Sequence, residues 1–178
     1  MKNIGLVLKL LVVLIFSSCH DDINMNSIGC CDHNSSLEGS INDPIFVPNI
    51  FTPNGDDIND IFYIRGNSIL SITNFEIRDK FEDIVFRVDY IDYEHNNTGW
   101  DGTVDGSIKK GMYDYSARIE TLDGLVGTVK GKICNYPCST DVTTQLTDRT
   151  NCRFDNTWLC FNSGFIDCYL AEDPGCFN

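Results

Sequence analysis

Short runs of alternating apolar and polar residues fill the segment from residue 45 to residue 133. Such alternation is typical of strands that bury one face, because successive side chains of a strand point to opposite faces. It is clearest at 75–78, 84–88 and 112–119, and no convincing run with helical spacing interrupts it. The pattern predicts an all-β unit of six or seven short strands, packed as a sandwich.

A turn signal and a proline refine this prediction. Asp123-Gly124 separates two alternating runs, and this dipeptide is a strong short-range signal of a β-hairpin. Residues 125–133 then return along the partner strand. Pro48 lies inside the apolar run 45–51, which favours an edge strand because proline has no N–H to donate to a sheet.

The first eighteen residues are strongly apolar. Lys2 precedes the run 4–16, which is apolar apart from one glycine and one lysine, and Ser17-Ser18 follows it. A basic start, an apolar run and small residues are the parts of a secretory signal peptide. The run is shorter than the roughly 20 residues that span a bilayer, so a membrane-spanning helix is the weaker interpretation.

The end of this signal, Phe16-Ser17-Ser18-Cys19, resembles the lipobox of bacterial lipoproteins. In that family the cysteine is acylated, with chains such as palmitate, and becomes the first residue after cleavage. The resemblance makes Cys19 the lipid anchor, and two or more acyl chains hold a protein firmly to a membrane. An ordinary secretory signal, with Cys19 in a disulfide, is the alternative.

The chain has nine cysteines. Setting Cys19 aside leaves eight, an even number, as expected for an oxidised exported protein. The segment 134–178 is too short to bury much core, so we expect disulfides to hold it together. Zinc is the competing interpretation, although only one pair has the spacing of thiolate ligands. The predicted disulfide cysteines, with pairing unassigned, are Cys30, Cys31, Cys134, Cys138, Cys152, Cys160, Cys168 and Cys176.

The formal net charge is −13 at pH 7. It argues against nucleic-acid binding, which needs a basic surface, so membrane contact is expected through the lipid alone. The sequence has no nucleophile elbow, zinc-protease helix or phosphate loop. We therefore expect a non-enzymatic protein without a cofactor, apart from one candidate calcium site.

That candidate is the loop 54–60, which has five oxygen-bearing side chains in seven positions. Calcium binds six to eight oxygens, often from Asp and Asn in a tight loop, and Asn54, Asp56 and Asp60 are the candidate ligands. The alternative is a structural turn, since Asn and Asp also hydrogen-bond their own backbone in turns.

The stretch from Pro48 to Phe62, PNIFTPNGDDINDIF, resembles the opening of the gliding-motility-associated C-terminal domain, the type B sorting domain of type IX secretion. Further blocks follow in family order at 74–77, 84–86, 100–103 and 111–115. That family is similar to immunoglobulin-like sandwiches, so the resemblance implies the same fold here. Trp100 is then expected in the core, with Gly102 and Gly111 in turns.

Three features depart from the family pattern. Phe81-Glu82 replaces the usual Trp-Gly between the middle strands, so a remodelled turn is expected there. Asp57 replaces the usual glycine of the Asn-Gly-Asp-Gly loop. A cysteine-rich segment follows a domain that normally ends its protein.

The predicted organisation is a lipoprotein signal peptide at 1–18, a tether at 19–43, an immunoglobulin-like sandwich at 44–133 and a small disulfide-rich appendage at 134–178. The first functional hypothesis is an outer-membrane or cell-surface lipoprotein with a protein partner, serving gliding motility, type IX secretion or adhesion. The second is a secreted cargo whose sandwich is the type IX sorting domain.

Overall fold

The computed structural model describes residues 33–94 and 98–137 of the chain, and these residues form ten strands and no helix. The all-β prediction is therefore confirmed for this part of the chain. In chain order the strands are β1 (Ser36–Gly39), β2 (Ile45–Phe46), β3 (Ile50–Phe51), β4 (Arg65–Gly66), β5 (Ile69–Arg78), β6 (Ile84–Asp92), β7 (Thr103–Val104), β8 (Ser107–Ile108), β9 (Gly111–Thr121) and β10 (Val126–Asn135).

The largest element is a six-stranded sheet in the order β1-β10-β9-β5-β6, with β3 added in parallel beside the end of β10. All its other pairings are antiparallel. The hairpin β9–β10 turns at Asp123-Gly124, where Gly124 has a φ of 80°. The predicted hairpin is thereby confirmed.

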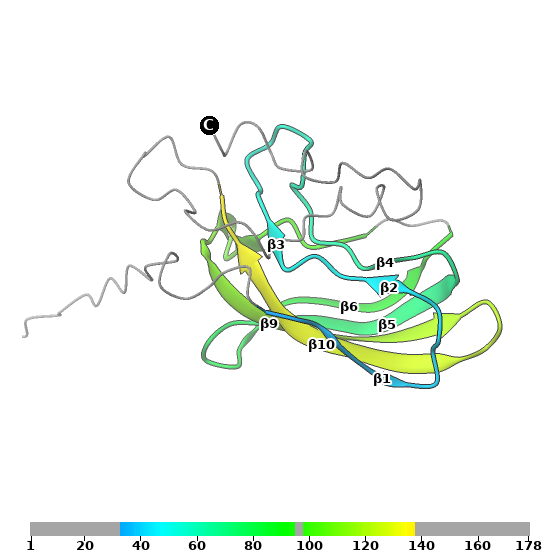
Figure 1. Cartoon of the computed structure of the whole chain (residues 1–178). Helices are drawn as coiled ribbons and strands as arrows, with labels where there is room; N and C mark the ends of the chain where they lie inside the picture. The colour runs from blue at the N-terminus through cyan, green and yellow to red at the C-terminus, as the bar shows by residue number, and fades with distance from the viewer. Residues whose placement is uncertain (1–32, 95–97, 138–178) are drawn as a thin grey trace, which may run out of the picture.

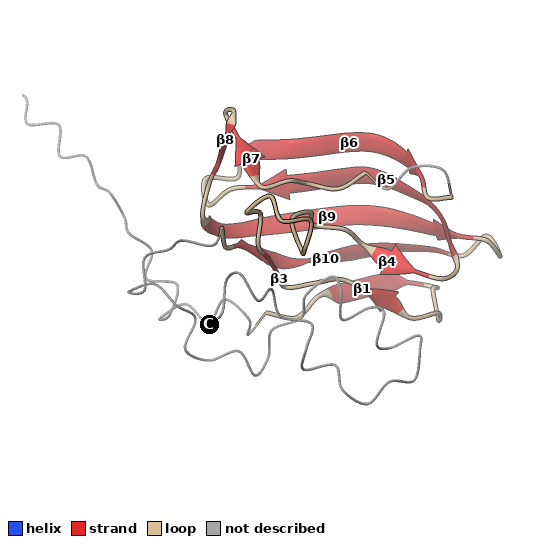
Figure 2. Cartoon of the chain, turned by 90° about the horizontal axis from the view of Figure 1, so that it is seen from above, coloured by secondary structure: helices blue, strands red, loops and turns tan. Residues whose placement is uncertain are grey.

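A second layer covers one face of this sheet, as Figures 1 and 2 show. It consists of the two-stranded sheets β2–β4 and β7–β8 and their connecting loops. Two facing layers are consistent with a β-sandwich. The apolar positions of β9 and β5 alternate into the space between the layers, as period-two patterning requires. The largest fully buried side chains there include Trp100, Phe51, Phe62, Phe75, Ile77 and Ile119.

The run 45–51 does not form one strand. Val47-Pro48-Asn49 separates β2, which pairs with β4, from β3, which pairs with β10. The proline marks the point at which the chain crosses from one sheet to the other, because it cannot continue a hydrogen-bonded ladder. Phe62, in the apolar run 61–64, lies in no strand and forms an isolated bridge with Trp100.

The folded unit begins earlier than the sequence pattern indicates. Residues 36–39 lie inside the expected tether, yet they form β1 and pair with residues 127–130 of β10. All four residues of β1 are exposed, so apolar patterning carries no signal of this strand. The predicted signal peptide and most of the cysteine-rich segment lie outside the described residues.

Candidate functional site at the motif-bearing end of the sheet

The family-like blocks are far apart in sequence and converge on one aromatic cluster. Phe51 lies 5.4 Å from Trp100 between ring centroids, and Phe62 lies 5.2 Å from Tyr115. Trp100 also meets Tyr113 edge-on, with centroids 4.7 Å apart. Tilted and edge-on contacts at these distances are the favourable geometries for aromatic pairs. The motif aromatics therefore form the core that joins the two layers.

Tyr113 is one of the two tyrosines in this cluster. Its hydroxyl donates a hydrogen bond to the Lys109 carbonyl at 2.9 Å. Burial raises the pKa of Tyr113 to about 12, and the charge of Asp79 adds to the effect. The phenol therefore stays neutral well beyond physiological pH.

The Trp100 turn is fixed to the last strand by a buried amide. The Nδ2 of Asn135, which is fully buried, donates to the Gly102 carbonyl at 2.9 Å. Gly102 has a φ of +79°, a conformation that favours glycine. Gly111 differs from the expectation, since it begins β9 without a positive φ. Nothing in the sequence pattern singles out Asn135, because a polar residue near a strand end is ordinarily exposed.

The candidate calcium ligands lie in one loop, and their oxygens accept hydrogen bonds from that loop. Asp60 Oδ1 accepts the N–H groups of Asn54 and Gly55 at 2.7 and 2.8 Å, and Asp60 Oδ2 accepts that of Asp57 at 2.7 Å. Asp56 Oδ1 accepts the backbone N–H of Ile58 at 2.9 Å. These contacts are those of the structural turn that the Asn and Asp residues also predicted.

Two residues occupy positions where the family usually has glycine, and both adopt a conformation that favours glycine. Asp57 and Glu82 each have a φ of 67°. The turn after β5 therefore adopts at Glu82 a backbone conformation that is easiest for glycine. Its carboxylate anchor is Asp79, whose Oδ1 accepts the N–H groups of Phe81 and Asp83 at 2.9 and 3.0 Å. Phe81 is 71% exposed at the tip of this turn.

Cys134 is the only predicted disulfide cysteine among the described residues. It lies near the end of β10, is fully buried and is disulfide-bonded. The proposed anchor Cys19 and the remaining cysteines of the prediction lie outside the described residues.

In the described ranges, no three His, Cys, Asp or Glu side chains are grouped closely enough to hold a metal ion. The same part of the chain contains no helix of the length and apolarity needed to cross a membrane.

The blocks in the sequence and their convergence in the fold agree with the comparison to known families. Residues 45–130 match the family model of the CHU_C type IX secretion signal domain. Over these residues the chain is similar to a type IX secretion signal domain. The resemblance to the type B sorting domain is thereby confirmed, and such a domain implies an exported protein, at the cell surface or secreted. No curated protein and no solved structure matches the chain.

Proposed function

We propose that the chain is a non-enzymatic lipoprotein of the outer membrane or cell surface, anchored through Cys19. Its secretion signal domain is an immunoglobulin-like sandwich that binds a protein partner in type IX secretion, gliding motility or adhesion. The cysteine-rich segment after it is a disulfide-stapled appendage. The type IX part of this proposal is supported by the family match at 45–130.

The observation that carries the proposal is the state of Cys134. This cysteine is buried, disulfide-bonded and placed near the end of β10, so the last strand of the domain is covalently tied rather than ending freely. Disulfides persist in oxidising compartments, which supports export. A partner then has the outer face and the edges of the sheet to bind, rather than a free end of the domain.

The second candidate is a secreted cargo, which the description of the family itself favours. In that case the domain is the export signal, and the chain needs no lipid. The two candidates differ at Cys19, because a cargo released to the medium carries an unacylated amino-terminal region.

The experiment is intact mass spectrometry of the full chain, together with fractionation, in a host that has the type IX machinery and in a matched strain without it. We expect diacylglyceryl and acyl mass on Cys19, and recovery of the protein in the membrane fraction. Cys19→Ser should release a soluble protein or leave the precursor uncleaved. Unacylated protein in the medium, dependent on the machinery, would favour the cargo; fully processed Cys19→Ser protein that stays in the membrane would rule out the lipid anchor.

A further inference from the structure

Strand β6 (Ile84–Asp92) is a long open edge of the large sheet. It pairs with β5 on one side, and no strand of the described residues pairs with its other side. Natural proteins usually protect such edges with proline, charged side chains (lysine above all), a bulge or a short strand. β6 has nine residues and contains neither proline nor lysine. Among the described strands, none pairs with the outward-facing backbone groups of β6, so this edge can accept a further strand.

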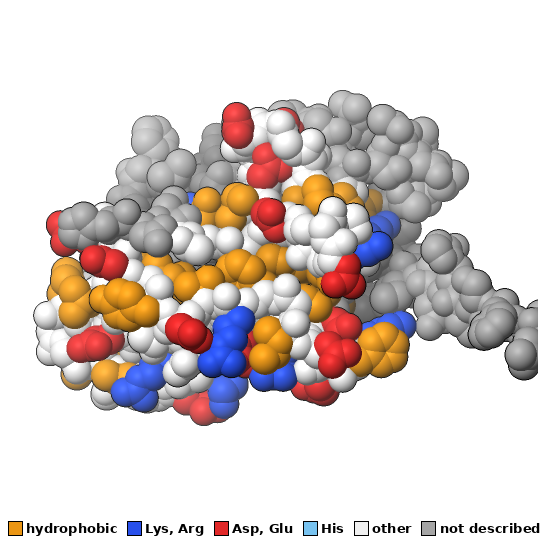
Figure 3. All heavy atoms as spheres, turned by 180° about the vertical axis from the view of Figure 1, so that it is seen from behind, with side chains coloured by type: hydrophobic (Ala, Val, Ile, Leu, Met, Phe, Trp, Pro, Cys, Tyr) orange, Lys and Arg blue, Asp and Glu red, His pale blue; other side chains and the backbone are white. Residues whose placement is uncertain are grey.

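The same edge exposes apolar side chains. Ile84 is 43% exposed and Tyr90 is 61% exposed, while Phe86 and Val88 pack against the core yet remain partly exposed. Figure 3 shows this side of the molecule, with an apolar band above a row of charged side chains. A strand added here would bury apolar surface as well as backbone hydrogen-bonding groups.

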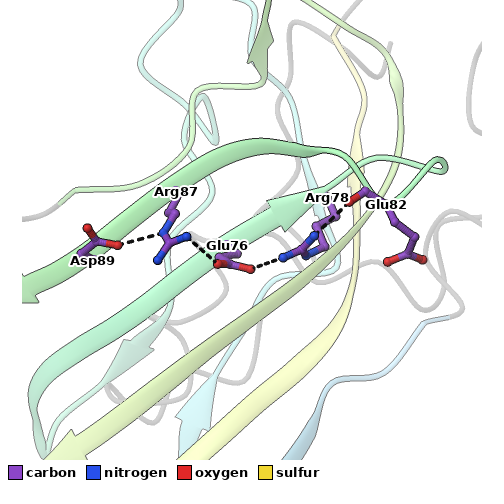
Figure 4. A network of polar contacts seen from close by, with 5 residues as sticks. All are labelled: Glu76, Arg78, Glu82, Arg87 and Asp89. Atoms are coloured by element: carbon purple, nitrogen blue, oxygen red, sulfur yellow. Dashed lines mark hydrogen bonds and ion pairs between the residues drawn. The ribbon is translucent and has the colours of Figure 1, made fainter.

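Arg87 and Asp89 carry opposite charges and flank Val88 in the sequence. Arg87 Nε and Asp89 Oδ1 are 2.8 Å apart, and their side chains are 50% and 79% exposed. Figure 4 shows them at the end of a chain of contacts that continues through Glu76. Because Asp89 is so exposed and a guanidinium has five N–H donors, both groups keep capacity for a further partner.

We propose that β6 pairs antiparallel with β6 of a second copy of this chain, about a two-fold axis through Val88. In this register Arg87 of each copy lies opposite Asp89 of the other, and Phe86 lies opposite Tyr90. The interface is then isologous, with the same patch on both copies. The inference uses only described residues and does not depend on the proposed lipid anchor.

The positions of the charges favour this register over parallel pairing and over shifted antiparallel registers. A parallel pairing in register places Arg87 against Arg87 and Asp89 against Asp89. Antiparallel registers shifted by two residues place one of these like pairs at the centre, and like charges directly opposite are destabilising. A shift by one residue turns the apolar side chains to the wrong face. The occupant that β6 fits best is therefore β6 itself.

The test is sedimentation equilibrium of the full chain in density-matched detergent, over a range of concentrations. The wild type should dimerise. Asp89→Arg or Arg87→Asp should weaken the dimer about tenfold to a hundredfold, because each converts two attractive pairs into two repulsive ones. The double variant, Arg87→Asp with Asp89→Arg, restores opposite charges across the axis and should restore dimerisation.

The matched control is Glu38→Arg on β1. Glu38 pairs with Lys130 at the other edge of the sheet, at 3.5 Å and with similar exposure, so the charge change and the loss of an exposed ion pair are equivalent. It should leave the dimer intact. Thermal unfolding of each variant checks that folding is kept. Three results would each overturn the proposal. The wild type could be monomeric at every concentration, the single charge reversals could leave the dissociation constant of the dimer unchanged, or the double variant could stay monomeric.

Discussion

Gly102 is a position at which a single added methyl group should destabilise the turn that follows Trp100. A Cβ at Gly102 would lie 2.5 Å from Asn135 Nδ2 and 3.0 Å from Pro53 Cγ. Real Cβ atoms essentially never approach another atom to 2.5 Å, so the buried amide has to move. That movement breaks its hydrogen bond to the Gly102 carbonyl.

Two separate costs then apply to Gly102→Ala. Alanine in the left-handed conformation costs about 1–2 kcal/mol. A buried amide left without its partner costs about 1–3 kcal/mol. We expect the free energy of unfolding to fall by about 2–5 kcal/mol, which for a domain of this size lowers the thermal midpoint by about 10 °C or more.

Gly106→Ala provides the matched control. Gly106 has a φ of +76°, and no atom lies within 4 Å of the position that a Cβ would take there, so only the conformational cost applies. Guanidinium chloride unfolding of both variants, followed by tryptophan fluorescence, measures the difference directly. If Gly102→Ala costs no more than Gly106→Ala, the Asn135 contact does not constrain this turn.

Further outcomes are expected from thermal or chemical unfolding. Glu82→Gly should stabilise by about 0.5–1 kcal/mol, since it removes a left-handed glutamate and keeps the carbonyl that accepts from Arg78 at 2.9 Å; a loss of stability would contradict this. Because the pKa of Tyr113 is raised to about 12, the unfolded chain loses this proton first, and stability should fall by about 2–3 kcal/mol as pH rises from about 10 to 12. Tyr113→Phe should remove that part of the pH dependence, and an unchanged slope would refute the assignment. Asp60→Ala removes the acceptor of three backbone N–H groups and should cost about 1–3 kcal/mol. Several millimolar calcium should leave the midpoint of the wild type unchanged; a calcium-dependent rise that Asp60→Ala abolishes would instead identify the loop as a calcium site.

The sequence predicted those parts of the fold that have local causes. The β9–β10 hairpin was readable because Asp123-Gly124 sets the turn and alternation sets both strands. The division of 45–51 into two strands could not be predicted, because the parallel pairing of β3 with β10 joins residues 84 positions apart, such as Ile50 and Cys134. Strand β1 could not be predicted either, because its exposed residues are held by backbone hydrogen bonds rather than by apolar burial.

The candidate site divides in the same way. The family resemblance predicted that Trp100 lies in the core, and Trp100 is 1% exposed there. The acidic loop left calcium and a hydrogen-bonded turn open, because residue types alone do not say where carboxylate oxygens point. The sequence alone gave no reason to single out Arg87 and Asp89. Their interest follows from the topology, which places β6 at the edge of the sheet.

The position of β10 has a consequence for the order of events during biogenesis. This strand is the last of the described strands to be synthesised, yet it lies inside the sheet, between β1 and β9. Ser36 of β1 pairs with Lys130, 94 residues further along the chain, and closing so long a loop is slow compared with forming a hairpin. Strands β1 and β3 have no partner strand until β10 has emerged, because both pair with β10. The topology therefore delays completion of the sheet until the whole domain has been synthesised.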